Sequence, residues 1–523
     1  MFQKNNRIFF FISICFAFGF YFSRSHVFDI PFFWDEAWVY GPAVKSMGNQ
    51  WCFLPSCAGD LSRGHPLLFH FLGGVWIKIF GDSNYSLHFF AFSISLALFF
   101  SFYYIVLKWY GAKQAVFLSA LVVVQNLIFS QSAMVYPEIL LTLFALWTFY
   151  FFWIKNRLLF FLFGFLMCLV KEQGVVIVAA ILFWEILTNL FRHSFRYFVQ
   201  KEFFLSFFLF LLQLSGLLIF LLLQKFQKGY WFFPEHIGMI KTDFRSIFYQ
   251  FKLSCHHLFL SNGRFILTAI IFSAFIFFSK KFNLLSRVSL VVVISLIMIS
   301  LTGVFRVPNL VILLAIFFIL SVILSSFMFV ELKEFFSSRM GLISALIISY
   351  LFFCAFNFFT LRYLAILVPF LFLFFYECAT IFLSVNKFQT IILSFVLLFS
   401  VFFLSIDKSI GDVSPRNYQA VLTQKEIIDR LILMGAQKQA VYTSFLMRNN
   451  LNRAASGFVP SDNFFPRSTN YLLPDSAFPS FVVHLSFEQD SAINAFLSAN
   501  GSRYHTVDQV NFGDSKGIIY QLK

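Results

Sequence analysis

Charge is the scarcest property of this sequence. Charged residues make up only 12% of the 523 residues, whereas soluble domains carry about 25%. Hydrophobic residues make up 59%, phenylalanine alone occurs 85 times, and the mean hydropathy is +0.80. A soluble globule could not bury that much apolar surface, whereas a bilayer accepts it. The composition therefore predicts a polytopic α-helical membrane protein.

Several other features are missing, and each absence narrows the possibilities. No basic stripe with interleaved aromatic residues stands out, so the net charge of +15 does not indicate nucleic-acid binding. The outer loops predicted below contain no DxD motif and no dense cluster of ligand residues, so we expect neither an essential metal nor another cofactor. There is also no internal repeat and no low-complexity tract beyond the phenylalanine excess.

The seven cysteines form no general pattern. Cys52 and Cys57 lie close together in "WCFLPSC". They are compatible with a disulfide in an oxidising compartment and equally with two free thiols. The CxxxxC spacing alone, without a second ligand pair, is a weak indication of zinc.

Apolar runs recur along most of the chain and predict about thirteen transmembrane helices, since about 20 apolar residues cross a bilayer. The first run, after Lys4 and Arg7, lacks a small-residue cleavage site, so we interpret it as an uncleaved span with a cytoplasmic N-terminus. The predicted spans are 8–24, 85–107, 114–131, 137–154, 158–171, 174–191, 203–224, 265–279, 288–304, 309–328, 341–358, 363–384 and 388–406.

The basic residues support this topology. The short connections on the predicted cytoplasmic side hold Lys108, Lys113, Lys155, Arg157, Arg192, Arg196, Lys201, Lys280, Lys281, Arg287, Lys333, Arg339 and Lys387. Short cytoplasmic loops retain lysine and arginine in this way. The predicted outer loop 225–264 is also basic, but long loops follow the rule poorly.

The composition changes at about Asp407. Residues 1–406 form the predicted transmembrane domain, with an outer loop at 25–84, and residues 407–523 form a small soluble α/β domain. An amphipathic helix and a short strand are predicted in "NYQAVLTQKEIIDRLILMGAQKQAVYTS", and further strands in "SFVVHLSF", "YHTVDQVNF" and "GIIYQLK". An odd number of spans places this domain outside the cytoplasm.

Ionisable residues gather at the predicted outer ends of the spans, where they are functional candidates by default. They are Asp35, Glu36, Asp60, Arg63, His65, Glu138, Lys171, Glu172 and Arg362, with Tyr363 adjacent to the last. Each also has a structural interpretation. Asp35 and Glu36 would cap a helix beginning at Ala37, and Lys171 and Arg362 would be snorkelling anchors.

Four ordered segments resemble the polyprenyl-phosphate-dependent glycosyltransferases with the GT-C fold. They are "DEAWVYGPAVKSMGNQW", "RGHPLLFHFLGGVWIKIFGDSNYSLHFFA", "SAMVYPEILLTLFALW" and "KEQGVV", and "LRYLAILVPF" fits a late Arg-Tyr segment of the family. This family includes the dolichyl-phosphate-mannose–protein mannosyltransferases and the bacterial transferases that add sugars to lipid A. The resemblance covers roughly residues 8–240.

The resemblance implies an inverting glycosyl transfer from a polyprenyl-phosphate-linked sugar. By position it implies that Asp35 is the catalytic carboxylate, with Glu36 beside it. We expect Lys171 and Arg362 to bind the donor phosphate, assisted by Arg63 or His65, because negative charge accumulates on that group. Glu138 and Tyr363 would support the site or contact the acceptor. The sequence departs from the family at "RGHP", at Glu138, where many relatives have Asp, and at "EQG", which replaces Gly-Pro.

The acceptor would be lipid A or lipopolysaccharide, another glycolipid, or a protein. The implied location is a bacterial inner membrane, with the C-terminal domain periplasmic or extracellular. Two alternatives are a transporter or flippase of lipid-linked sugars and a non-catalytic membrane protein with a partner-binding domain. Transporters often show repeat symmetry and charges near the midplane, and neither is seen here.

Overall fold

The computed structural model describes residues 2–57, 61, 63–193, 201–269, 338–357, 359–382, 386–471, 478–488 and 490–523. Two predicted spans, 288–304 and 309–328, lie outside these residues, as do most of span 265–279 and the candidate Asp60. The chain divides into two compact units. Unit 1 comprises Met1–Phe18, Leu96–Ile128 and Pro137–Ile406, and unit 2 comprises Gly19–Ser95, Phe129–Tyr136 and Asp407–Lys523.

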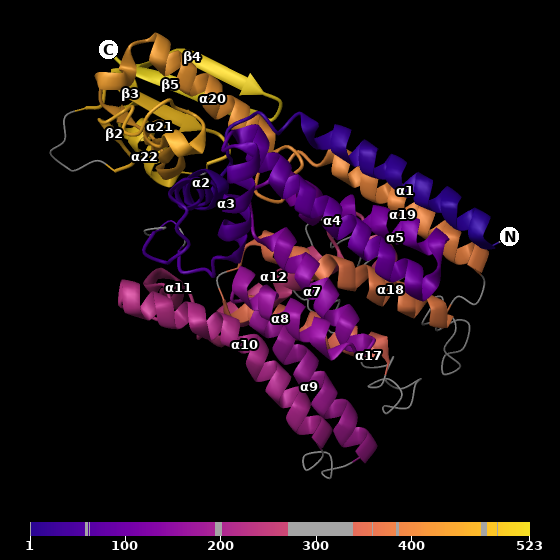
Figure 1. Cartoon of the computed structure of the whole chain (residues 1–523). Coiled ribbons are helices and arrows are strands. Elements are labelled where there is room, and N and C mark those ends of the chain that lie inside the picture. Colours follow the sequence, from indigo (N-terminus) through magenta and orange to yellow (C-terminus); the bar gives the residue numbers. More distant parts are fainter. Residues whose placement is uncertain are drawn as a thin grey trace. The chain divides into compact units, whose positions relative to one another are not determined.

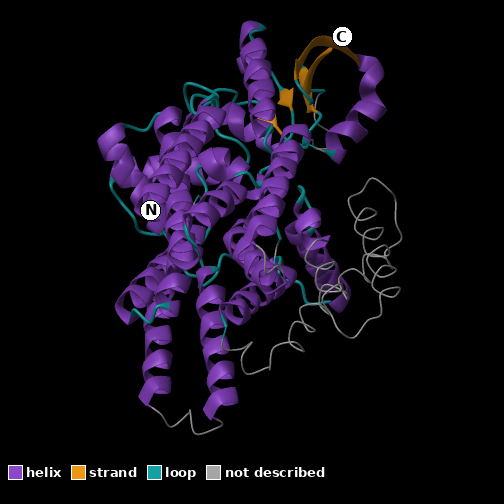
Figure 2. Cartoon of the chain, turned by 90° about the vertical axis from the view of Figure 1, so that its right-hand side faces the viewer, coloured by secondary structure: helices purple, strands orange, loops and turns teal. Residues whose placement is uncertain are grey.

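Helices dominate the chain, and strands occur only near its C-terminal end in the part that the structure describes (Figures 1 and 2). The apolar helices are α1 (Phe2–Ser25), α4 (Asn84–Tyr110), α5 (Ala112–Val123), α7 (Glu138–Trp153), α8 (Arg157–Val170), α9 (Gly174–His193), α10 (Lys201–Lys228), α17 (Arg339–Phe356), α18 (Val368–Phe382) and α19 (Asn386–Ile406). Within the described residues, five helices are long and apolar enough to cross a membrane, or six if one bent pair counts as a single span. The predicted polytopic membrane fold is confirmed, whereas the count of thirteen stays a prediction.

The prediction of one continuous helix over 114–131 is wrong. The chain breaks after α5 and continues as α6 (Asn126–Phe129) and the 3-10 helix η2 (Ser130–Ala133). Polar side chains lie at the break and make hydrogen bonds there. The Gln125 amide donates to the carbonyl of Leu121 and to the hydroxyl of Ser400, and the Asn126 side chain accepts from the backbone N–H of Leu127. Such local bonds compete with the regular helical ladder.

The predicted loop 225–264 is also largely helical. It contains α11 (Pro234–Gly238) and α12 (Phe244–Phe259). Asp243 begins α12 as an N-cap, accepting from the backbone N–H of Ser246 at 2.7 Å. The buried Arg264 donates to the carbonyl of Leu258 at 2.7 Å near the end of α12, where a cation complements the helix dipole.

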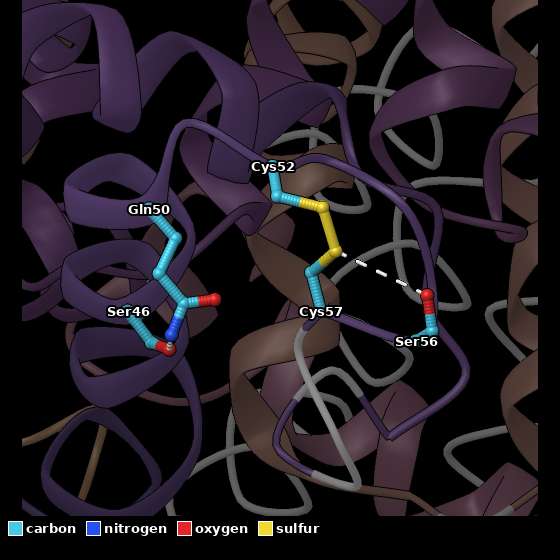
Figure 3. Close-up of a disulfide and its surroundings, with 5 residues drawn as sticks. All are labelled: Ser46, Gln50, Cys52, Ser56 and Cys57. Carbon is cyan, nitrogen blue, oxygen red and sulfur yellow. Dashed lines mark hydrogen bonds between the residues drawn. A yellow bond between two sulfur atoms is a disulfide. The ribbon is translucent and has the colours of Figure 1, made fainter.

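The loop after α1 folds into short helices. They are the π-helix η1 (Glu36–Tyr40), α2 (Gly41–Gln50) and α3 (Leu68–Phe80). Cys52 and Cys57, which lie between α2 and α3, form a disulfide (Figure 3). Their Cα atoms are 5.9 Å apart, within the usual range for a disulfide. The structure therefore selects the disulfide over the two free thiols that the sequence left open.

The C-terminal part of unit 2 confirms the predicted small α/β domain. Its sheet has the strand order β2-β1-β3-β5-β4. The strands are β1 (Val441–Tyr442), β2 (Ser468–Thr469), β3 (Phe481–Leu485), β4 (Tyr504–Phe512) and β5 (Ser515–Leu522). β1 is parallel to β2 and β3, and β5 is antiparallel to β3 and β4. The helices here are α20 (Asn417–Leu433), α21 (Phe445–Asn452) and α22 (Ser491–Asn500), with short 3-10 turns η5 (Ala436–Lys438), η6 (Ala454–Ser456) and η7 (Gly501–Arg503).

Alternation along β3 explains the two faces of this sheet. Phe481, Val483 and Leu485 belong to the main core of unit 2, with α20, whereas Val482 packs in a separate cluster with Ile493 of α22. Successive side chains of a strand point to opposite faces. The main core also contains Phe33, Val39 and Tyr40 of the first loop, and Met134 and Tyr136. The first loop and the C-terminal domain therefore share one hydrophobic core.

Candidate functional site

Unit 1 contains a buried cluster of charges that involves Glu138, Lys171 and Arg362. Lys171 and Glu138 are 0% and 2% exposed, and Arg362 is 4% exposed. Lys171 Nζ donates to Glu138 Oε1 at 2.8 Å. Arg362 Nε lies 3.2 Å from the same oxygen, an ion-pair contact without hydrogen-bond alignment. Two cations thus share one carboxylate oxygen.

Helix ends bring these three residues together. Glu138 is in the first turn of α7, directly after Pro137, where a carboxylate also complements the helix dipole. Lys171 ends α8 in an extended conformation. Arg362 lies in the 3-10 helix η4 (Leu361–Leu367), which leads into α18. The structure brings these three residues into contact, and their location at the outer face of the membrane stays a prediction.

The turn between α8 and α9 needs a glycine to place Lys171. The N–H of Gly174 donates to the carbonyl of Lys171 at 3.0 Å. A Cβ at position 174 would lie only 2.8 Å from the carbonyl oxygen of Met167. Gly174, in the "EQG" that replaces the family's Gly-Pro, therefore allows this close approach of two backbones.

Tyr363 and Gln173 complete the surroundings of the cluster. Lys171 Nζ lies 4.4 Å from the centroid of the Tyr363 ring, a cation–π distance. The Tyr350 hydroxyl donates to Gln173 Oε1 at 2.8 Å, beside the half-buried Glu172. No described residue hydrogen-bonds to Glu138 Oε2, which is buried. Because Lys171 and Arg362 are buried, the interpretation of both as snorkelling anchors is wrong.

Unit 2 holds the carboxylate pair, and the two members differ sharply. Glu36 is 1% exposed and accepts from the backbone N–H groups of Phe33 at 3.1 Å and Val135 at 2.7 Å. Its Oε1 also lies 3.0 Å from His88 Nε2. The other ring nitrogen of His88 is 2.9 Å from the carbonyl of Phe28. Both His88 contacts are hydrogen bonds when both ring nitrogens carry protons.

Asp35 is only half-buried. Its Oδ1 accepts from the indole N–H of Trp38 at 3.0 Å, and it makes no side-chain cap bond to the helix that follows. The capping interpretation is therefore wrong for Asp35. Trp34, directly before it, has φ 48°, a left-handed conformation that costs a non-glycine residue about 1–2 kcal/mol. Such strain persists only where surrounding contacts hold it, and it often marks functional sites.

Arg63 and His65 lie in the same unit as Asp35. Arg63 and Gly64 have successive positive φ values of 48° and 72°, which form a tight turn. The Arg63 guanidinium carbon lies 4.8 Å from the centroid of the Trp38 ring. His65 is 6% exposed, and its ring stacks on Tyr40 at 6.2 Å between centroids. Asp35, Arg63 and His65 thus lie around η1, and Glu36 lies in its first turn.

Comparison with known proteins gives a family match for part of the chain and a similar fold for the whole of it. Residues 64–223 match the model of the dolichyl-phosphate-mannose-protein mannosyltransferase family. The structure is similar to that of ArnT from Cupriavidus metallidurans bound to undecaprenyl phosphate, with TM-score 0.50 and 10% identity over 99% of this chain and 98% of ArnT. The chain has the GT-C fold. ArnT in the apo state gives TM-score 0.42 and 12% identity over the same shares. No curated protein sequence matches the chain significantly.

Sequence reasoning did not single out His88 or His70, two buried polar residues of this GT-C chain. His88 lies in α4, and its Nε2 is 3.0 Å from Glu36 Oε1. His70 in α3 is 1% exposed, and neither of its ring nitrogens has a hydrogen-bond partner among the described residues. Burial lowers the pKa of His70 to about 3, with the charge of His65 adding to the effect. An isolated histidine within an apolar run gives no signal of such a position.

Among the described residues, no group of three or more His, Cys, Asp or Glu side chains is placed to hold a metal ion.

Proposed function

We propose that this protein is a membrane glycosyltransferase that moves a sugar from a polyprenyl-phosphate-linked donor to an acceptor on the outer face of the membrane, with inversion at the anomeric carbon. The GT-C fold and the family match over residues 64–223 support this class of reaction. The observation that carries the proposal is the buried contact of Lys171 and Arg362 with one oxygen of Glu138.

This cluster suits a phosphate leaving group. Lys171 and Arg362 are both buried against the Glu138 carboxylate, and lysine and arginine side chains bind phosphate groups through charge-assisted contacts. Negative charge accumulates on the lipid phosphate as its bond to the sugar breaks, and fixed cations stabilise that charge. Glu138 contacts both cations through Oε1, and its Oε2 has capacity to accept a hydrogen bond from the substrate.

Asp35 is the proposed general base. In the reaction the acceptor oxygen or nitrogen attacks the anomeric carbon, the bond from that carbon to the phosphate oxygen breaks, and the acceptor proton passes to Asp35. The base must lie within hydrogen-bond reach of that proton, and a half-buried carboxylate is accessible in a way that Glu36 is not. Glu36 instead braces the loop through Phe33, Val135 and His88.

Arg63 and His65 are proposed to assist in binding the donor phosphate, and Tyr363 to hold Lys171 through its ring. The proposed location is a bacterial inner membrane with a cytoplasmic N-terminus and a periplasmic or extracellular C-terminal domain. The disulfide between Cys52 and Cys57 supports an oxidising environment for the first loop. The proposed acceptors are lipid A or lipopolysaccharide, another glycolipid, or a protein.

The test is transfer of radiolabelled sugar from polyprenyl-phosphate donors to candidate acceptors in isolated membranes. We expect Asp35→Asn to lower the transfer rate at least about 100-fold, since general base catalysis contributes about 10²–10⁴-fold. Asp29→Asn is the matched control, because Asp29 is an exposed carboxylate in the same loop. Full activity of Asp35→Asn would refute the assignment of the base. Mass spectrometry of envelope glycans in a deletion strain would name the sugar and the acceptor.

A further inference from the structure

Trp38 is contacted from several directions at once. Its indole N–H donates to Asp35 Oδ1 at 3.0 Å. One face of its ring lies against the Arg63 guanidinium at 4.8 Å. The Phe445 ring meets it edge-on, with the centroids 5.1 Å apart and the planes at 90°. The orientation of the indole N–H is therefore fixed by the packing of the ring.

The C-terminal domain supplies part of this packing. Phe445 is the first residue of α21, and Arg453 follows the end of the same helix. Arg453 Nη1 donates to the backbone carbonyl of Trp38 at 2.8 Å, a charge-assisted bond of the stronger class. The carbonyl of Ser456 also accepts from the backbone N–H of Phe32 at 3.1 Å. The domain thus holds both the backbone and the side chain of the segment that carries Asp35.

The segment needs such support. Trp34 is in a left-handed conformation immediately before Asp35, and residues in such conformations keep them only when their surroundings over-determine them. Asp35 itself is half-buried. A carboxylate that must meet an acceptor proton within hydrogen-bond distance therefore depends on neighbours for its direction.

We propose that Trp38 and Arg453 are positioning residues for Asp35, so that the C-terminal domain takes part in catalysis by orienting the base. Trp38 acts through its indole N–H, and Arg453 acts through the backbone of Trp38. The catalytic readout of this inference rests on the proposed function, whereas its structural readout does not.

Three variants separate the contributions. Trp38→Phe removes the N–H donor and keeps an aromatic ring for Arg63 and Phe445. Arg453→Met removes the bond to the Trp38 carbonyl, and Arg453→Lys keeps a cationic donor of similar length. Arg416→Met is the matched control, because it removes an ion pair with Asp514 (2.9 Å) in the same domain that does not involve Trp38.

We expect Trp38→Phe and Arg453→Met to lower kcat about 10- to 100-fold, as misplacement of a catalytic group does, with the KM for the donor unchanged. Arg453→Lys should recover part of the loss, and Arg416→Met should match the parent protein. The double variant Trp38→Phe/Arg453→Met should be no worse than its more severe single variant, because both act on one group. Unchanged kcat, or a loss confined to KM or to the yield of folded protein, would overturn the proposal.

Hydrogen exchange followed by mass spectrometry tests the same idea without any substrate. Amide hydrogens of Glu36–Tyr40 should exchange faster in Arg453→Met than in the parent protein or in Arg416→Met. Equal exchange would overturn the positioning role. If the parent protein transfers sugar from none of the polyprenyl-phosphate donors, the proposed function fails, while the exchange rates still decide whether Arg453 holds the segment.

Discussion

Glu138 and Lys171 offer the sharpest test of the buried charge cluster, because removing one or the other has opposite consequences for its charge. Glu138→Gln makes the net charge of the cluster more positive by one and removes the carboxylate that contacts both cations. Lys171→Met makes the net charge less positive by one and leaves the pair of Glu138 with Arg362. The structure therefore predicts that the first substitution is the more destabilising, although both remove one charge.

The distances set the scale of the effect. Lys171 Nζ and Arg362 Nε lie 2.8 and 3.2 Å from Glu138 Oε1. At an effective dielectric constant of about 20, these distances correspond to gross attractions of about 6 and about 5 kcal/mol. Desolvation offsets much of this, and breaking a buried pair by removing one partner typically costs about 3–5 kcal/mol. We expect Glu138→Gln to fall in that range and Lys171→Met to cost clearly less.

A thiol-reactive fluorogenic maleimide can follow thermal unfolding in detergent. Four described free cysteines are buried and become reactive as the chain unfolds, namely Cys168, Cys255, Cys354 and Cys378. The exposed Cys15 is removed beforehand by Cys15→Ser in every variant. A melting temperature of Glu138→Gln equal to that of the parent protein would refute the electrostatic account of the cluster.

The same two variants separate stability from catalysis. Lys171→Met should lower kcat/KM for the polyprenyl-phosphate donor about 100-fold, the size of effect seen when a group that stabilises developing charge is removed. It should do so with little loss of melting temperature. If Lys171→Met stayed fully active, the lysine would be a structural partner of Glu138 and not a ligand of the donor phosphate.

Two further predictions concern unit 2. Glu36→Gln should lower the melting temperature and reduce the free energy of unfolding by about 3 kcal/mol. The reason is that one amide oxygen cannot replace a carboxylate that contacts Phe33, Val135 and His88. An unchanged melting temperature would contradict the bracing role. Burial raises the pKa of Glu488 from 4.5 to about 7, so the folded protein binds the proton more tightly than the unfolded chain. Stability should therefore decline between about pH 4.5 and pH 7, by about 3 kcal/mol, and level off above that. Glu488→Gln should flatten this dependence in melting curves, whereas a slope equal to that of the parent protein would exclude Glu488 as its source.

The membrane class and the C-terminal domain could be predicted because both depend on local patterns. Apolar runs give helices whatever their neighbours are, since the backbone must satisfy its own hydrogen bonds in lipid. The strand β4 was predicted with its observed bounds, Tyr504–Phe512, because a short run that contains β-branched and aromatic residues indicates a strand without reference to distant parts of the chain. The helix break after α5 was not predicted, because the surrounding residues are apolar and the pattern gives no sign of the hydrogen bonds that the side-chain amides of Gln125 and Asn126 make.

The sequence by itself determined which ionisable residues needed an explanation, because charge in an apolar chain is conspicuous and costly. The sequence shows Asp35 and Glu36 as neighbours, but it does not distinguish the role of one carboxylate from that of the other. Only the tertiary structure did so, by burying Glu36 against Val135 and His88, which lie far away in the chain, and leaving Asp35 half-exposed beside Trp38. Partners that are distant in sequence meet through packing, and it is those partners that decide whether a carboxylate braces the fold or faces a substrate.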